Sequence, residues 1–315
     1  MKILIKPLVA ILVVTICLVS TTTLTSASEY KVVHTEEIIS FEPYVSDTFK
    51  IDPKYAQKVK QKQEAAESYY NAIVKGDFKL AAQYKDEFEQ ISNPTLYQMR
   101  KDTLNTQTSV RNTYPSNWRI PDLYQYPQER SYWCGCAAAQ SILQNIGITK
   151  SQAELAGDSY LQTERFGNTP WYITNSDSPS EYPMATTLVN AQFEVSNYAF
   201  GYKPSPLGAA GANPLTVEQC KAYVMSTTSA FDDGYGVAAC GTSKGSNSAY
   251  RLPGYPSYNI GHWVVSDGYK DNGDYIWIVD PAKSDVISWS NSISAYYNIS
   301  ATLFRNFVSP RGIVW

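Results

Sequence analysis

Histidine is the scarcest chemically useful residue in this sequence. The 315 residues include only two, His34 and His262, and they contain neither a Cys-x-x-Cys pair nor a His/Cys cluster with zinc-ligand spacing. We therefore expect no metal site and no cofactor. If an imidazole acts as a base it is His262, because His34 lies in a polar stretch without a helical or strand pattern. Otherwise His262 is a strand residue satisfied by one hydrogen bond.

Charge is also sparse. Charged residues make up 17% of the chain, the net charge is −3, and 43% of the residues are hydrophobic. A weakly acidic chain lacks the basic face that nucleic-acid binding needs, so we expect no nucleic-acid partner. The apolar fraction, together with 25 Tyr and 7 Trp, excludes a disordered, collagenous or coiled-coil protein.

Long hydrophobic runs are confined to the start of the chain. Lys2 and Lys6 precede a nearly unbroken apolar run over residues 8–19, and small residues follow up to Ala27. This pattern predicts a secretory signal peptide over residues 1–28 and a secreted protein. A run of twelve is short for a membrane span, which takes about 20 residues. An uncleaved membrane anchor is the alternative.

The composition divides the remaining chain near residue 105. Of the 77 residues from 29 to 105, 24 are charged, against 29 of the 210 residues from 106 to 315, and all seven Trp lie in the second part. In the first part, Asp52-Pro53 and Asp77 are helix starts, whereas Gly76 and Ser92-Asn93-Pro94 are helix ends. We predict a charged region at 29–105 that contains a helical hairpin, followed by a globular domain at 106–315.

The second part mixes helices and strands. We expect helices over residues 137–146 and 217–228 and strands over 236–241, 262–269 and 275–279. Asn272-Gly273 between the last two strands is a hairpin signal. Helices followed by antiparallel strands indicate an α+β fold.

One cysteine stands at the start of a predicted helix. Cys134 is followed by Gly135, Cys136 and an Ala-rich stretch, and Gln128 precedes it by six residues. The free N–H groups of a helix start favour a thiolate, which is the nucleophilic form of cysteine. The amide of Gln128 and the N–H of Cys134 are suited to binding an oxyanion. Alone, such a cysteine is more often a small buried hydrophobe.

A base and a carboxylate lie on the predicted hairpin. Gly261-His262-Trp263 begins one strand, and Asp280-Pro281 ends its partner. A carboxylate beside an imidazole orients it and stabilises its protonated form. Because strand side chains alternate, His262 and Asp280 share a face only if paired residue numbers sum to an even value. A plain two-residue turn at Asn272-Gly273 gives an odd sum, so the hairpin needs an odd-length loop or a bulge.

The order of these residues resembles the papain-like fold, and most closely the peptidase C-39-like domains of secreted bacterial proteins. The resemblance covers roughly residues 120–290. It implies Cys134 as the nucleophile, His262 as the base, Asp280 as its orienting group and Gln128 as the oxyanion donor. The family's usual Cys-Gly-Pro-Ala reads Cys-Gly-Cys-Ala here. The implied fold places a catalytic helix against an antiparallel sheet, after the helical hairpin region.

These observations together predict an exported cysteine peptidase acting on a peptide or protein substrate. The cell wall or envelope is a further candidate partner. Alternatives on the same fold are an amidase or peptidoglycan hydrolase of the NlpC type, an acyl transferase, and a secreted binding protein that has lost catalysis. The NlpC type normally has a second histidine. This chain lacks one there, because His262 is the only histidine after residue 34. Papain-like enzymes often carry an inhibitory helical prosegment, so residues 29–105 are either a prosegment or a permanent spacer.

Further residues border the predicted site. We assign Trp133, Gly135, Gly261 and Trp263 to substrate binding, with core packing as the alternative for the two tryptophans. Residues 241–260 are rich in Gly, Ser, Asn, Pro and Tyr and are expected to form a mobile flap. Cys220 and Cys240 are candidates for a disulfide, and Cys136 is an alternative partner for either.

Overall fold

The computed structural model describes residues 53–104, 114–171, 173, 182–193, 202–204 and 215–315. The expected signal peptide at 1–28 and the start of the charged region lie outside the described residues. No helix in the described ranges has the length and apolar character needed to cross a membrane.

A single antiparallel sheet forms the centre of the described structure. Its strands run in the order β2-β7-β3-β4-β5-β6, and β1 pairs with β4. The predicted hairpin is formed by β4 and β5, which pair in antiparallel fashion. The bounds are β1 (Trp118–Arg119), β2 (Tyr202–Pro204), β3 (Val237–Ser243), β4 (Ile260–Lys270), β5 (Tyr275–Val279), β6 (Tyr296–Ser300) and β7 (Gly312–Val314).

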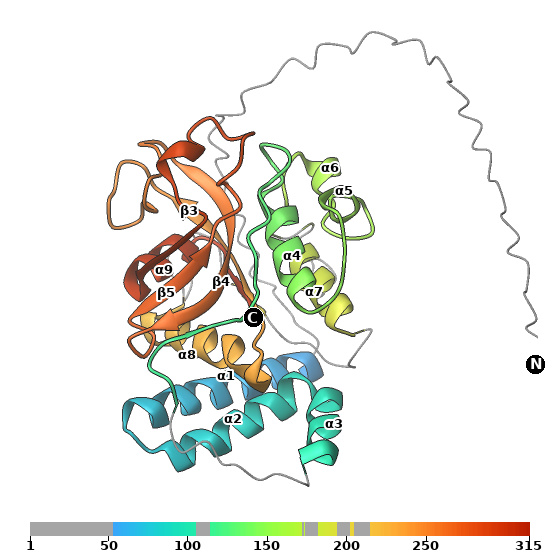
Figure 1. Cartoon of the computed structure of the whole chain (residues 1–315), viewed down its shortest axis with the longest axis vertical. Helices are drawn as coiled ribbons and strands as arrows, with labels where there is room; N and C mark the ends of the chain where they lie inside the picture. The colour runs from blue at the N-terminus through green and yellow to red at the C-terminus, as the bar shows by residue number, and fades with distance from the viewer. Residues whose placement is uncertain (1–52, 105–113, 172, 174–181, 194–201, 205–214) are drawn as a thin grey trace, which may run out of the picture. The chain divides into compact units, whose positions relative to one another are not determined.

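Helices cover both faces of this sheet (Figure 1). Successive β3 residues alternate between two hydrophobic clusters, one packed on α4 and the other on α8 and α9. The α+β class is therefore confirmed, with the helix that begins at Cys134 packed against an antiparallel sheet. The helices here are α4 (Cys134–Asn145), α5 (Gln152–Leu155), α6 (Thr163–Phe166), α7 (Pro183–Phe193), α8 (Val217–Thr228) and α9 (Ala301–Val308).

The expected N-terminal helical hairpin is present as α1 (Pro53–Val74) and α2 (Phe78–Ser92). Asp77 caps α2 as predicted, since its Oδ1 accepts a hydrogen bond from the Leu80 N–H at 3.0 Å. A third helix, α3 (Pro94–Leu104), follows at once. Asn93, predicted only as part of a helix end, also caps α3, because its side chain accepts a hydrogen bond from the Leu96 N–H at 2.9 Å.

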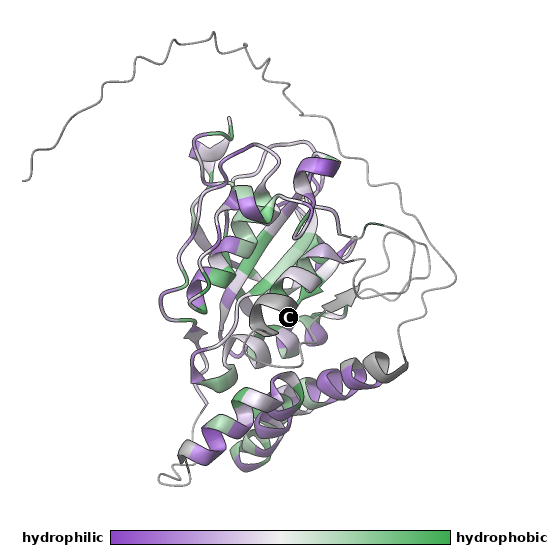
Figure 2. Cartoon of the chain, turned by 90° about the vertical axis from the view of Figure 1, so that its right-hand side faces the viewer, coloured by the Kyte–Doolittle hydropathy of each residue, from purple (hydrophilic) through white to green (hydrophobic). Residues whose placement is uncertain are grey.

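These N-terminal helices share a core with the second part of the chain. Phe88 of α2 stacks on Trp315 at 6.1 Å between ring centroids, and Trp315 stacks on Tyr223 of α8 at 4.0 Å. Lys62 Nζ donates to the main-chain oxygen of Trp315 at 2.7 Å, and the Tyr223 hydroxyl donates to Glu67 at 2.6 Å. Polar residues cover much of the remaining helical surface (Figure 2). The role of residues 29–105, as a prosegment or as a permanent spacer, stays a prediction.

This shared core predicts the effect of Phe88→Ala. The side chain is buried between α1, α2 and Trp315, so its removal is expected to cost about 3–5 kcal/mol in the free energy of unfolding. Urea denaturation followed by tryptophan fluorescence measures this loss, and all seven Trp lie outside the helical region. The exposed Val74→Ala is the matched control. A destabilised helical region that melts alone, with the fluorescence transition unmoved, would contradict a shared core.

Candidate active site

The pairing of β4 with β5 places His262 and Asp280 on the same face of the sheet. Near the turn, Gly268 pairs with Trp277, whereas beyond Asp267 the pairs are Ser266 with Ile278 and Val265 with Val279. Asp267 is thus the extra residue of a β-bulge, which changes the sum of paired numbers from odd to even. Continued by one pair, the second register places Val264 opposite Asp280, so His262, two residues away, lies on the same face.

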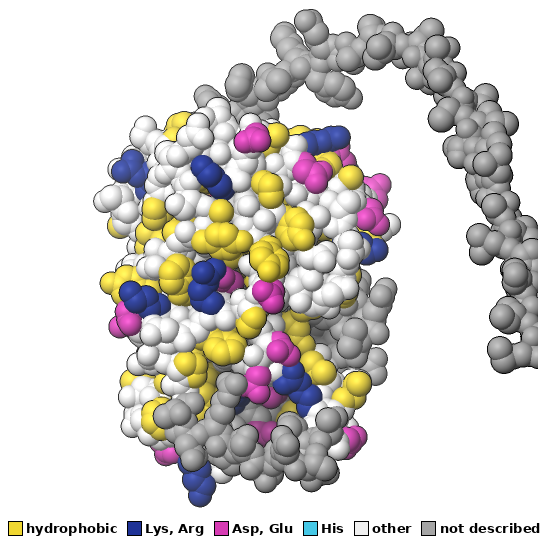
Figure 3. Space-filling view, in the orientation of Figure 1, with side chains coloured by type: hydrophobic (Ala, Val, Ile, Leu, Met, Phe, Trp, Pro, Cys, Tyr) yellow, Lys and Arg dark blue, Asp and Glu magenta, His cyan; other side chains and the backbone are white. Residues whose placement is uncertain are grey.

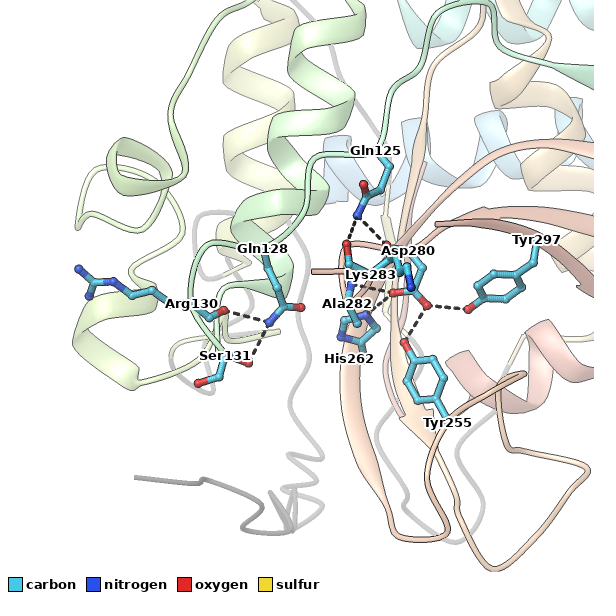
Figure 4. Close-up of polar contacts among 10 residues, drawn as sticks. All are labelled: Gln125, Gln128, Arg130, Ser131, Tyr255, His262, Asp280, Ala282, Lys283 and Tyr297. Carbon is cyan, nitrogen blue, oxygen red and sulfur yellow. Dashed lines mark hydrogen bonds and ion pairs between the residues drawn. The ribbon is translucent and has the colours of Figure 1, made fainter. Parts of the chain in front are cut away.

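The carboxylate of Asp280 is fully buried and accepts four hydrogen bonds (Figure 4). Its Oδ1 lies 2.9 Å from His262 Nε2 and accepts from the Ala282 N–H at 2.9 Å. Its Oδ2 accepts from the hydroxyls of Tyr255 at 2.8 Å and Tyr297 at 2.7 Å. Although burial acts to raise it, His262 and these donors hold the pKa of Asp280 below its usual range.

His262 is also buried, with 5% of its surface exposed, and it interacts with both Asp280 and Cys134. On the face shown in Figure 3, no histidine side chain is visible among the described residues. Burial alone would lower the pKa of His262, but the negative charge of Asp280 and the interactions with Asp280 and Cys134 outweigh it and raise the pKa above 6.5. Since Nε2 faces Asp280, the other ring nitrogen, Nδ1, is the one available to Cys134.

The two cysteines at the start of α4 differ in their surroundings. Cys134 is the first residue of the helix and is partly exposed. Cys136 is fully buried, and its Sγ lies 3.2 Å from Thr163 Oγ1 as a hydrogen-bond donor. Burial raises the pKa of Cys136 to about 12, so its thiol stays protonated at neutral pH. The structure therefore offers Cys134, and not Cys136, to an incoming substrate.

Gln128 departs from the role expected from the sequence. Its Nε2 donates to the main-chain carbonyls of Arg130 and Ser131, both at 2.9 Å, so both amide hydrogens are used. The Oε1 is buried without a hydrogen-bond partner and lies on the side of His262 in Figure 4. In this arrangement Gln128 supports the turn before Cys134, and its amide reaches an oxyanion only by giving up one of these bonds.

The two tryptophans assigned to substrate binding are core residues. Trp133 and Trp263 are 3% and 2% exposed, and they belong to the hydrophobic cluster around α4. The indole Nε1 of Trp263 donates to the main-chain oxygen of Thr169 at 3.0 Å. Gly135 serves packing as well, because a Cβ there would clash with the Thr169 side chain. Gly261 is partly exposed in β4, and its role in substrate binding stays a prediction.

The expected disulfide between Cys220 and Cys240 is not formed. Cys240 projects from β3 into the cluster around α4, whereas Cys220 of α8 belongs to the cluster on the other face of the sheet. The sheet separates the two sulfur atoms, so the pairing was wrong for a topological reason that sequence spacing does not contain. Cys136 is a free thiol and bonds to neither of them.

Sequence reasoning missed Tyr255 and Tyr297, which bind the Asp280 carboxylate. In a chain with 25 Tyr, no local pattern distinguishes these two. Tyr255 lies in the segment expected to be a mobile flap. There, Tyr255 and Leu252 are buried, and the Leu252 N–H donates to Ser243 Oγ at 3.0 Å. The segment is therefore anchored beside the site and contributes a hydroxyl group to it.

Asp267, the residue of the β-bulge, bonds to an arginine and not to His262. Its Oδ2 accepts a hydrogen bond from Arg119 Nε at 2.9 Å and a second one from the same guanidinium. Burial nevertheless raises the pKa of Asp267 above its usual value. The described residues contain no group of three or more His, Cys, Asp or Glu arranged to hold a metal ion.

Because the chain has only two histidines, the NMR signals of His262 can be assigned and its charge state measured. We expect the ring resonances of His262 to titrate above pH 6.5, because Asp280 and Cys134 favour the imidazolium. In Asp280→Asn, the negative charge that counteracts the effect of burial is lost, so the pKa of His262 should fall. In the unaltered protein, where the folded-state pKa is raised, protonation of His262 stabilises the folded state fully at pH below 6.5, and this contribution disappears as the pH rises through the folded-state pKa.

The measurement is an NMR titration of the histidine Cε1–H signals, with His34→Gln to assign them. A pKa of His262 at or below 6.5 in the unaltered protein, or one that does not respond to Asp280→Asn, would refute the charge pairing.

The two tyrosines predict an effect on acid stability. A hydrogen bond to a charged group contributes about 1.5–3 kcal/mol, so Tyr297→Phe should destabilise the fold by roughly that amount at neutral pH. Asp280, whose folded-state pKa is lowered, contributes stability above its unfolded-state pKa and loses it on acidification. The difference between Tyr297→Phe and the unaltered protein should therefore shrink as the pH falls.

Denaturant unfolding over a range of pH measures this difference, and Tyr275→Phe is the control because Tyr275 is exposed. If the cost of Tyr297→Phe were independent of pH, the hydroxyl would not be acting on the Asp280 carboxylate.

Comparison with known proteins gives one family. The model of the Peptidase_C39 like family matches residues 117–303, which is more than half of the chain and includes all four predicted catalytic positions. A crystal structure from Bacillus anthracis described as a C39-like peptidase is similar with 14% sequence identity, a TM-score of 0.36 and coverage of 63% of this chain and 96% of that one. No curated protein matches. On the strength of the family match over residues 117–303, the chain belongs to the Peptidase_C39 like family.

Proposed function

We propose that the protein is an exported cysteine peptidase that hydrolyses peptide bonds with Cys134, His262 and Asp280. The observation that carries this proposal is the buried His262–Asp280 pair at 2.9 Å, which interacts with the partly exposed Cys134 at a helix start. The family match supports the peptidase class. Export rests on the signal-peptide pattern of residues 1–28.

In the first chemical step, the Cys134 thiolate attacks the carbonyl carbon of a peptide bond. A C–S bond forms and the carbonyl electron pair moves to the oxygen. The carbon–nitrogen bond then breaks, and the imidazolium of His262 gives its Nδ1 proton to the leaving amine. Asp280 holds Nε2 throughout and stabilises the charged ring.

In the second step, water hydrolyses the acyl-enzyme. The now neutral His262 accepts a proton from the water, and the resulting hydroxide attacks the thioester carbonyl. The C–S bond breaks, the acid product leaves, and the proton on His262 restores the ion pair with the Cys134 thiolate.

The negative oxygen formed in both steps needs hydrogen-bond donors. The N–H of Cys134 is available because the first N–H groups of a helix have no partner within the helix. The partial positive charge of the helix start adds to this stabilisation. Gln128 joins as a second donor only if it exchanges one of its bonds to Arg130 and Ser131 for the oxyanion.

The test uses the purified mature protein and iodoacetamide. We expect alkylation at Cys134, located by peptide mass mapping, and cleavage of unstructured protein substrates. Cys134→Ala should abolish both, whereas Cys136→Ala should leave alkylation in place because the Cys136 thiol is buried and protonated.

Selective alkylation of Cys136 would overturn the assignment of the nucleophile. Alkylation of Cys134 with release of ammonia or of peptidoglycan fragments, and no peptide cleavage, would indicate an amidase. Transfer of the acyl group to an added amine in preference to water would indicate a transferase, and absence of any reaction a binding protein.

A further inference from the structure

We propose that Glu164 is a positioning residue for the oxyanion site, which it stabilises by fixing Trp133 and, through it, the N–H of Cys134. This inference rests on the proposed cysteine peptidase activity. It concerns the turn formed by residues 130–133, which leads directly into α4 and has Gln128 on its inner side.

The carboxylate of Glu164 collects side chains from three of the four turn residues. Its Oε1 accepts hydrogen bonds from Trp133 Nε1 at 2.8 Å, from the Tyr132 hydroxyl at 3.1 Å and from Arg130 Nη1 at 3.1 Å. The Arg130 guanidinium also lies over the Trp133 ring, 4.5 Å from its centroid. One carboxylate on α6 therefore binds three of the four side chains of the turn that precedes Cys134.

The bond to Trp133 matters most among these three. The side chains of Arg130 and Glu164 are 54% and 47% exposed, so their ion pair competes with water and contributes little. Trp133 is buried, and a buried indole N–H needs an acceptor. Without the carboxylate, the indole either loses its hydrogen bond or moves.

A movement of Trp133 would be transmitted to the oxyanion site. Trp133 is the residue immediately before Cys134 and occupies the N-cap position of α4. Its main-chain oxygen accepts the Ala137 N–H at 3.0 Å, and its own N–H donates to Arg130 at 3.0 Å. The peptide group that joins Trp133 to Cys134 carries the Cys134 N–H, so its orientation follows that of Trp133.

The residue next to Glu164 fixes the other side of the nucleophile. Thr163 Oγ1 lies 3.2 Å from Cys136 Sγ and 2.8 Å from Thr169 Oγ1, all within the buried interior. The packing of Thr169 against Gly135 leaves no room for a Cβ at that position. Two consecutive residues of α6 thus hold the main chain on both sides of Cys134.

The experiment compares two reactions of Cys134 in the full chain. With iodoacetamide, the sulfur forms a bond to carbon and iodide leaves, so no oxyanion arises. With p-nitrophenyl acetate, the sulfur attacks a carbonyl, the electron pair moves to oxygen, and p-nitrophenolate then leaves. Only the second reaction needs the donors at the helix start.

We expect Glu164→Gln to slow acetylation by p-nitrophenyl acetate about ten- to a hundredfold and to leave the alkylation rate unchanged. Trp133→Phe, which keeps a smaller aromatic ring and removes the N–H donor, should reproduce the effect. The double variant should be no slower than either single variant, because both changes break the same bond. Asp158→Asn, an exposed carboxylate on the same stretch, should alter neither rate.

The outcomes separate the two proposals. If iodoacetamide does not modify Cys134 in the unaltered protein, the proposed function fails. If Cys134 is alkylated but acetylation is unchanged in both Glu164→Gln and Trp133→Phe, the positioning role of Glu164 is wrong. A fall of both rates by the same factor would show a general loss of the nucleophile and would equally overturn the inference.

Discussion

A buried carboxylate that must remain charged is the constraint on which the site depends. Asp280 is surrounded by protein on all sides, and a charge in such a place is tolerated only when its oxygens are bonded to donors. Four donors come from four separate places: β4, the segment before it, the chain just after β5, and β6. Satisfying this one carboxylate therefore fixes the relative positions of three neighbouring strands. The imidazole of His262 lies between Asp280 and Cys134 and is held in place by its hydrogen bond to this fixed carboxylate.

The support of the nucleophile follows a different principle. Cys134 interacts with His262, and its position comes from the start of α4 and from the turn before it. Gln128 binds the carbonyls of this turn from the inside, and Glu164 binds its side chains from the outside. The His262–Asp280 pair is thus held by the sheet and Cys134 by helices, and the proposed reaction takes place where the two meet.

Local chemistry let the sequence predict a good part of this arrangement. The cap at Asp77, the hairpin around Asn272-Gly273 and the helix at Cys134 depend on neighbouring residues, and each is present. The need for an odd-length loop or a bulge between His262 and Asp280 could be deduced because strand side chains alternate, and the structure has the bulge. Those features share one property: their cause lies within a few residues of the chain.

Long-range packing accounts for what the sequence did not reveal. Nothing near Tyr255 or Tyr297 shows that their hydroxyls meet Asp280, and nothing near Glu164 shows that it meets Trp133. Trp133 and Trp263 were assigned to substrate contacts because they flank the site in sequence, yet strand and helix geometry turns both rings into the core. The separation of Cys220 from Cys240 likewise follows from the sheet between them.

The bulge at Asp267 makes the length of β4 as important as its composition. Deleting that single residue would leave a regular hairpin, with its turn and its apolar residues intact, but His262 would then project from the face opposite Asp280. The shared face of His262 and Asp280 therefore depends on the number of residues between the histidine and the turn and not on which residue stands at position 267. In an alignment of relatives, a single-residue gap here would mark loss of the proposed catalytic pair even where Cys134, His262 and Asp280 are all retained.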